Sequence, residues 1–205
     1  MGSYEISPEQ GLESAMRMIK EGRVQAVKLE GGATMAPTIS RIAQAGIPVV
    51  AHIGLTPQRH NSLGGFRVQA KTASAAVKLM RDALAVQEAG AFMVVIEAVP
   101  AEIAAIVTRK LRIPTIGIGA GNTCSGQVMV QVDMVGNFAS GRYLLPKFVK
   151  TYADVWGEAS RGIQRYRQEV KDRAFPSTEY TYPVSQDAVA EFEKAIALAG
   201  DVDEN

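Results

Sequence analysis

The 205-residue sequence has a single cysteine, Cys124, which excludes an internal disulfide framework and fits a reducing compartment. No apolar run approaches the ~18 residues of a membrane-spanning helix, so we expect no membrane contact. The 22 basic and 21 acidic residues leave a net charge of +1, which gives no electrostatic case for binding nucleic acid. Met1-Gly2-Ser3-Tyr4 has neither the basic nor the apolar part of a targeting segment. We therefore expect a protein of the cytoplasm or the mitochondrial matrix.

What the chain does contain is a regular alternation of helix and strand patterns. Ser7 followed by Pro8 predicts a helix start, because Ser caps helix N-termini and Pro is tolerated in the first turn. Short apolar runs bounded by glycine or proline predict buried strands. The predicted strands cover residues 24–30, 47–54, 92–97, 113–121 and 127–133, and the predicted helices 8–21, 37–46, 73–90 and 100–111. This alternation predicts an α/β protein with parallel strands, either an open doubly wound sheet or part of a (β/α) barrel.

Two regions lie outside this alternation. Residues 56–72 form a long polar segment with two glycines, and a loop of this length in a compact domain is usually functional or disordered. Beyond residue 133 the sequence becomes rich in aromatic residues and predicts a C-terminal helical extension. We expect helices at 152–170 and 186–199 with an extended arm at 173–183. The predicted domains are 1–150, which holds the βα units, and 151–205, which packs on that domain or on a neighbouring subunit.

Charged residues end the first predicted strand. Lys28 and Glu30 are two positions apart, so their side chains project from the same face. A structural ion pair at a strand end is one explanation. The other is chemical: Glu30 suits a hard divalent cation such as Mg²⁺, and Lys28 suits a substrate carboxylate or enolate oxygen.

Two further polar residues end the next strands. Glu97 closes the most apolar strand, where burial disfavours a charged carboxylate, and a carboxyl group in that setting suits a general base or acid. The alternative is a carboxylate held in a salt bridge just before Val99-Pro100. His52 has the same two readings: it contacts a ligand, or it is a hydrogen-bonded histidine at a strand end. Parallel strands gather chemistry at their carboxyl ends, so the shared location of these residues favours a site.

The glycine loop from Gly117 to Gly121 resembles a phosphate-binding loop only superficially. It follows a predicted strand, as phosphate-binding loops do, but it lacks the Gly-Lys-Ser/Thr of a Walker motif. The loop is therefore a weak signal for a phosphate site, since glycine-rich turns after a strand are common.

Several strings resemble the ketopantoate hydroxymethyltransferase family, in one register from residue 2 to about residue 185. They are Ser7-Pro8-Glu9-Gln10, Val27-Lys28-Leu29-Glu30-Gly31-Gly32, Val50-Ala51-His52-Ile53-Gly54-Leu55-Thr56-Pro57-Gln58, Gly65-Phe66-Arg67-Val68-Gln69, Ile96-Glu97-Ala98-Val99-Pro100, Ile116-Gly117-Ile118-Gly119-Ala120-Gly121, Gly126-Gln127-Val128-Met129-Val130 and Pro146-Lys147-Phe148-Val149-Lys150.

The resemblance implies a (β/α)₈ barrel enzyme that transfers a hydroxymethyl group to 3-methyl-2-oxobutanoate, giving 2-dehydropantoate for pantothenate and coenzyme A. It implies 5,10-methylenetetrahydrofolate as co-substrate, Mg²⁺ as cofactor and a homo-oligomeric assembly. Glu97 matches the proton acceptor, and Lys28, Glu30 and His52 match substrate-binding positions, with Glu30 also a metal ligand. His52 has the least defined role of the four.

The sequence also departs from this family. Family members begin earlier, with strands that supply an Asp-Ser pair and a second Asp for metal and keto acid. We therefore expect an incomplete barrel with about five of eight βα units, poor metal affinity and impaired activity. Ala70 stands where the family usually has Gly, and Ser125 where Asp is common. The rival hypotheses are a non-catalytic short form that joins full-length subunits, and a Mg²⁺-dependent 2-oxo acid lyase on the same barrel.

Overall fold

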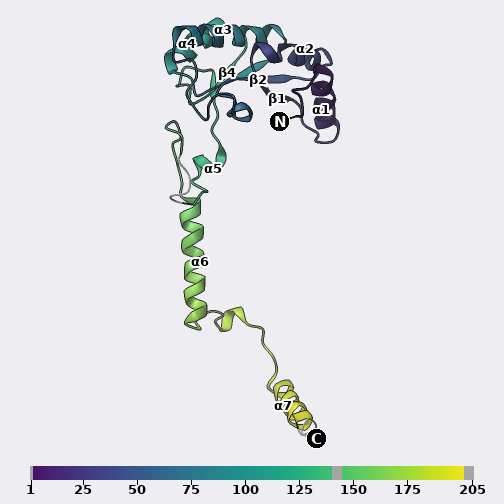
Figure 1. Ribbon diagram of the computed structural model, residues 1–205. Helices are drawn as coiled ribbons and strands as arrows, with labels where there is room; N and C mark the ends of the chain where they lie inside the picture. Colours follow the sequence, from purple (N-terminus) through teal and green to yellow (C-terminus); the bar gives the residue numbers. More distant parts are fainter. Residues whose placement is uncertain (1, 140–144, 201–205) are drawn as a thin grey trace. The chain divides into compact units, whose positions relative to one another are not determined.

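The computed structural model describes residues 2–139 and 145–200, and Figure 1 shows its ribbon. The chain separates into two compact units, Met1–Ala153 and Asp154–Asn205. The first unit holds the sheet and the helices packed on it. The second unit is helical. Each unit is described by itself.

The first unit is built on a five-stranded parallel sheet whose strands follow one another in chain order. They are β1 (Val27–Glu30), β2 (Val49–Gly54), β3 (Met93–Glu97), β4 (Thr115–Ile118) and β5 (Gly126–Gln127). Every neighbouring pair is parallel, which confirms the predicted βα architecture. A doubly wound sheet reverses its strand order at a switch point, whereas the strand order here never reverses over the described residues. The fold is therefore an incomplete (β/α) barrel.

Helices cover one face of this sheet. They are α1 (Pro8–Lys20), α2 (Ala36–Gln44) preceded by the short η1 (Ala33–Met35), α3 (Ala73–Glu88) and α4 (Ala101–Lys110). Figure 1 shows α2, α3 and α4 lying along the same side of the strands. Ile53 and Ile96 point into the core on this side, together with Ile39 and Ile42 of α2. Each fully buried side chain of this size contributes about 1.5–3 kcal/mol through removal of apolar surface from water.

Side-chain alternation places polar and apolar residues together on the opposite face of the sheet. Because Ile53 and Ile96 face the helices, their neighbours His52 and Glu97 face away from them. In a closed barrel this second face is the interior. The register puts Val95, Ile116 and Ile118 on this face as well, so His52 and Glu97 share it with apolar residues.

Local sequence explains where the helices begin and end. Ser7 Oγ accepts a hydrogen bond from Gln10 N at 3.1 Å, which confirms the predicted cap of α1. Thr72 caps α3 in the same way through Ala75 N, at 3.2 Å. The chain leaves α3 through Gly90 at φ +98°, a conformation that favours glycine.

The prediction of a strand at 127–133 is wrong. β5 ends at Gln127, the last ladder bond runs from Val128 N to Gly117 O, and residues Gln131–Met134 form the short helix α5. The alternating valines that suggested a strand, Val128, Val130 and Val132, are about half exposed. β5 pairs only with β4 among the described strands, so no second partner holds the following residues in the sheet.

The second unit contains α6 (Val155–Lys171), η3 (Thr178–Tyr180) and α7 (Gln186–Gly200). Asp154 caps α6 through Gly157 N at 3.0 Å. Phe175 packs against Tyr166 and Tyr180, with ring centroids 5.5 and 5.6 Å apart, which ties the end of α6 to the predicted arm. The prediction that this region packs on the barrel or on a neighbouring subunit remains a prediction. In the described part of the chain, no helix is both long enough and apolar enough to cross a membrane.

Candidate active site

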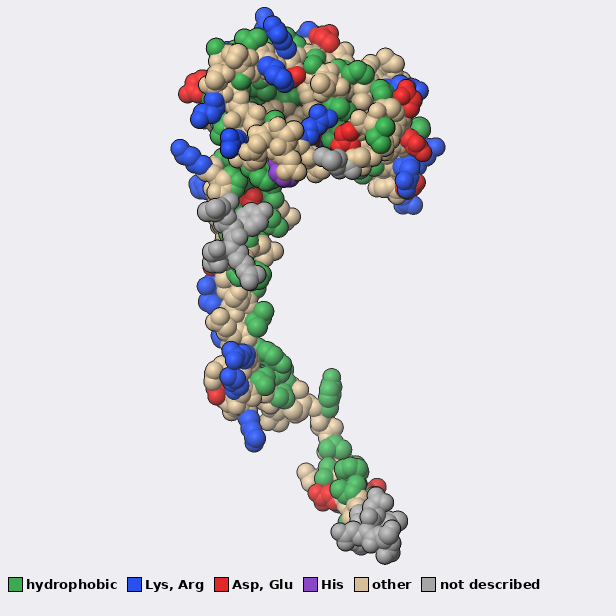
Figure 2. All heavy atoms as spheres, viewed as in Figure 1, with side chains coloured by type: hydrophobic (Ala, Val, Ile, Leu, Met, Phe, Trp, Pro, Cys, Tyr) green, Lys and Arg blue, Asp and Glu red, His purple; other side chains and the backbone are tan. Residues whose placement is uncertain are grey.

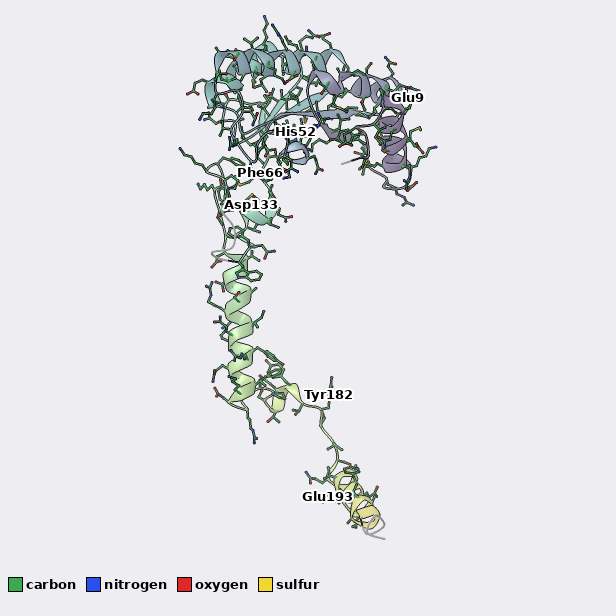
Figure 3. The ribbon with its side chains drawn as sticks, viewed as in Figure 1. Glu9, His52, Phe66, Asp133, Tyr182 and Glu193 are labelled. Atoms are coloured by element: carbon green, nitrogen blue, oxygen red, sulfur yellow. The ribbon has the colours of Figure 1, made fainter. Side chains whose placement is uncertain are left out.

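The predicted site residues sit on three adjacent strands, at or near their carboxyl ends. The register pairs Glu30 of β1 with His52 of β2, and Gly54 of β2 with Glu97 of β3. Paired residues of a parallel sheet share a face, so Lys28, Glu30, His52 and Glu97 all lie on the face away from the helices. Figure 3 shows His52 among the strands of the first unit.

Lys28, His52 and Glu97 form a continuous line of polar groups across this face. Lys28 Nζ lies 3.0 Å from His52 Nδ1, and His52 Nε2 lies 2.9 Å from Glu97 Oε2. His52 and Glu97 are only 4% and 9% exposed, while Lys28 is exposed. A lysine ammonium can only donate, so His52 Nδ1 accepts from Lys28 and the ring proton resides on Nε2, facing Glu97.

The contact between His52 and Glu97 is close but poorly aligned. His52 Nε2 is a buried atom that forms no hydrogen bond of acceptable geometry within the described residues, although Glu97 Oε2 is 2.9 Å away. Hydrogen bonds between catalytic groups are often misaligned without substrate, so a separation of 2.9 Å still allows His52 and Glu97 to act as a pair. A buried N–H that is not fully engaged is rare, and it can serve a bound ligand.

Glu30 has different partners. Its carboxylate is buried, at 6% exposure, and Oε2 accepts a hydrogen bond from Gln58 N at 3.0 Å. Within residues 2–139 and 145–200, no group of three His, Cys, Asp or Glu side chains is close enough to hold a metal ion. Mg²⁺ is commonly held by one or two carboxylates together with waters and substrate oxygens. Glu30 therefore fits the place of one ligand, and the described residues alone do not make a metal site.

Tyr4 also contacts this site, which no sequence pattern predicted. Glu30 N donates a hydrogen bond to Tyr4 Oη at 3.2 Å. Burial raises the pKa of the Tyr4 phenol, the hydrogen bond from Glu30 N opposes that rise, and the Glu30 carboxylate adds to it. A tyrosine in the short segment before a helix has no periodic pattern that would mark it. The contact depends on how this segment folds back onto β1.

Folding should raise the pKa of the Tyr4 phenol, so Tyr4 should ionise at higher pH in the folded chain than in the unfolded chain. The unfolded chain releases this phenol proton near pH 10, while the folded chain keeps it to higher pH. The folded state then binds more protons, so the contribution of Tyr4 to stability is complete below about pH 10 and is lost as pH rises above it. A spectrophotometric titration at high pH, wild type minus Tyr4→Phe, should give a midpoint above 10.

The same difference titration on the urea-unfolded protein provides the reference. A Tyr4 midpoint that coincides with this reference would contradict the burial of the Tyr4 hydroxyl against Glu30.

A cavity of about 610 Å³ opens beside Glu97, and we call it the Glu97 cavity. Its lining is mostly apolar and includes Leu55, Phe66, Val99, Pro100 and Phe148. Another cavity, of about 280 Å³, lies nearer Arg59 and Lys78 and touches none of the four predicted site residues. An apolar pocket with a few polar groups is the usual form of a small-molecule site, so we place the chemistry in the Glu97 cavity.

The glycine loop serves packing. Gly119 has φ +63°, and a Cβ there would lie 2.5 Å from Phe148 Cδ1. Gly121 has φ +76°, and a Cβ there would lie 2.4 Å from Ala101 Cβ. These glycines are therefore explained by the close approach of Phe148 and α4, without a phosphate ligand.

Comparison with known proteins gives one consistent result. The sequence model of the family described as ketopantoate hydroxymethyltransferase matches residues 1–178. Three curated relatives carry the name 3-methyl-2-oxobutanoate hydroxymethyltransferase. The protein of Emericella nidulans is 69% identical over 196 residues, covering 96% of this chain and 56% of the relative. That of Oleidesulfovibrio alaskensis is 47% identical over 199 residues, covering 97% and 68%. That of Rhodococcus jostii is 56% identical over 181 residues, covering 88% and 61%. The chain thus spans between about half and two thirds of the length of these relatives.

Proposed function

The chain belongs to the ketopantoate hydroxymethyltransferase family, and from this premise we propose that it transfers a hydroxymethyl group from 5,10-methylenetetrahydrofolate to 3-methyl-2-oxobutanoate. The product is 2-dehydropantoate, a precursor of pantothenate. The observation that carries the proposal is the buried Glu97 carboxylate, which borders a cavity and lies 2.9 Å from His52 Nε2.

In this proposal Glu97 removes the C3 proton of the keto acid. The C3–H bond breaks, and a bond forms between C3 and the methylene carbon of the co-substrate. Both carbon–nitrogen bonds of the methylene bridge then break, and water supplies the hydroxyl group of the product. The proton from C3 and one proton from water end on the two folate nitrogens, so no oxidant or reductant is needed.

The remaining site residues hold the reacting groups. His52 positions the Glu97 carboxylate, and its Nε2 proton is available to a substrate oxygen. Lys28 fixes the tautomer of His52 and adds positive charge beside the oxygens on which the enolate charge develops. Glu30 is the residue that would hold Mg²⁺, which, when bound, supplies Lewis-acid polarisation of the keto-acid carbonyl.

We also propose a homo-oligomer in a reducing compartment, the cytoplasm or the mitochondrial matrix. The second unit supports an assembly because α6 exposes large apolar side chains: Trp156, Ile163, Tyr166 and Val170. Together with Ala159 they recur every three or four residues, which places them along one side of the helix. Figure 2 shows hydrophobic side chains along α6 and the segment after it. Exposed apolar surface of this extent on a helix commonly marks a contact with another protein chain.

Exchange of the C3 proton of 3-methyl-2-oxobutanoate in D₂O, followed by NMR, tests the proposal. The wild-type chain should catalyse this exchange without folate when Mg²⁺ is present, because proton removal precedes transfer. The sample should first show a cooperative melt. Absence of exchange from a well-folded sample would contradict the proposal and favour a non-catalytic short form.

A further inference from the structure

We propose that the Glu97 cavity binds the folate co-substrate, with its aromatic rings against Phe148 and Phe66 and its glutamyl carboxylates at Arg67 and Lys147. This inference rests on the proposed function and assigns one of its two substrates to named residues. Three features of the cavity carry it: its position, its aromatic lining and its two cationic side chains.

The position follows from the chemistry. The methylene carbon of the co-substrate must reach the carbon that Glu97 has deprotonated, so both substrates meet beside this carboxylate. Glu97 is the one member of the four-residue site that borders this cavity. The volume of about 610 Å³ lies within the usual range of small-molecule sites. The keto acid, with only eight heavy atoms, would leave most of that space empty.

Two aromatic rings form walls of the cavity, and other contacts position both of them. Phe148 lies against Gly119, where a Cβ would come within 2.5 Å of the ring. Phe66 stacks on His60 with ring centroids 5.0 Å apart and an interplanar angle of 7°. Phe66 nevertheless remains 70% exposed, so one face of its ring is open. Rings presented in this way stack on flat heterocycles.

The segment that carries Phe66 is hydrogen-bonded to the end of β3, the strand that carries Glu97. Gln69 N donates to Ala98 O at 2.8 Å, directly after Glu97, and Ala98 N donates to Ile118 O at 2.9 Å. Gln69, three residues after Phe66, is therefore anchored to the residue that follows the proposed base. Ala70 follows this anchor and is buried at φ +57°.

Two cations border the same cavity. Arg67 and Lys147 are both exposed members of the lining, and neither forms an ion pair with a carboxylate in the part of the chain that the structure describes. Apolar walls, open aromatic rings and two unpaired cations fit a flat aromatic ligand with an acidic tail. Folate has this composition, with a pterin, a p-aminobenzoyl group and a glutamate.

Calorimetric titration with 5-formyltetrahydrofolate tests the assignment. We expect the wild-type chain to bind this probe, and Phe148→Ala to weaken binding about tenfold through loss of stacking. Phe92→Ala is the matched control, because Phe92 is also partly exposed but precedes β3, at the opposite end of the strand from Glu97. Binding should be unchanged in this control.

A second experiment tests the contribution of the cations at the Glu97 cavity. Arg67→Gln removes an exposed side chain without disturbing packing, so it keeps the proposal testable if Phe148→Ala does not fold. It should weaken binding several-fold and reduce the loss of affinity on adding salt. Arg41→Gln, an exposed arginine on α2, should do neither.

The outcomes separate this inference from the proposed function. A wild-type chain that exchanges the C3 proton but does not bind the probe would overturn the cavity assignment alone. Equal affinity of wild type and both cavity variants would also overturn it. Binding that depends on Phe148 and Arg67 would support the assignment even from a chain that shows no exchange.

Discussion

Replacing Glu97 by glutamine is expected to slow exchange of the C3 proton at least about 100-fold. Glutamine has the same shape and still offers a carbonyl oxygen to His52 Nε2, 2.9 Å from the present carboxylate. It cannot accept a proton near neutral pH, so the change removes the base and leaves the packing. The measurement is the exchange rate by NMR in D₂O with Mg²⁺ and without folate.

Glu102→Gln is the matched control. Glu102 lies five residues further on, in the first turn of α4, and its side chain is exposed. Its replacement removes the same charge from the same part of the chain without touching the cavity lining, and exchange should stay within about twofold of wild type. If Glu97→Gln exchanges as fast as this control, another group removes the proton and the proposed mechanism is wrong.

The location of the site could be predicted because of a general property of parallel sheets. Strands that run in one direction end at one edge, so polar residues that close apolar strands must come together there. This reasoning placed Glu30, His52 and Glu97 at the carboxyl ends of their strands, and the structure has them at or near the ends of β1, β2 and β3. The register adds that all three share one face. It could not give their contacts. The approach of Lys28 to His52, which fixes the histidine tautomer, depends on side-chain conformations that strand spacing leaves open.

Contacts between segments far apart in sequence could not be predicted, for a related reason. Phe148 closes the Glu97 cavity by lying on Gly119, but glycine after a strand has many explanations and the ring gives no sign of its partner. Tyr4 reaches Glu30 from a segment without periodicity. The failed strand at 127–133 shows the complementary limit: alternating valines indicate a pleated surface, but only a neighbouring strand can stabilise it.

The glycine that ends β2 shows how the sheet holds Glu97 in place. We expect Gly54→Ala to lower the free energy of unfolding by about 3 kcal/mol or more. Gly54 has φ +86°, and a Cβ there would lie 2.3 Å from the carbonyl oxygen of Glu97 and 3.0 Å from Val99 Cγ2. That carbonyl accepts a hydrogen bond from Leu55 N at 2.9 Å, so backbone on both strands would have to move.

Gly46→Ala is the matched control, because it separates the steric clash expected at Gly54 from the cost of a left-handed backbone conformation. Gly46 has nearly the same φ, +83°, but no atom lies within 4 Å of where its Cβ would be. Alanine there should cost only about 1–2 kcal/mol, the strain of a left-handed conformation. Urea unfolding of both variants measures the difference. Because the displaced carbonyl belongs to Glu97 itself, Gly54→Ala protein that still folds should also exchange the C3 proton more slowly than Gly46→Ala protein. Equal losses of stability would mean that β2 and β3 slide apart easily, and that the carboxylate is held by His52 and not by the sheet.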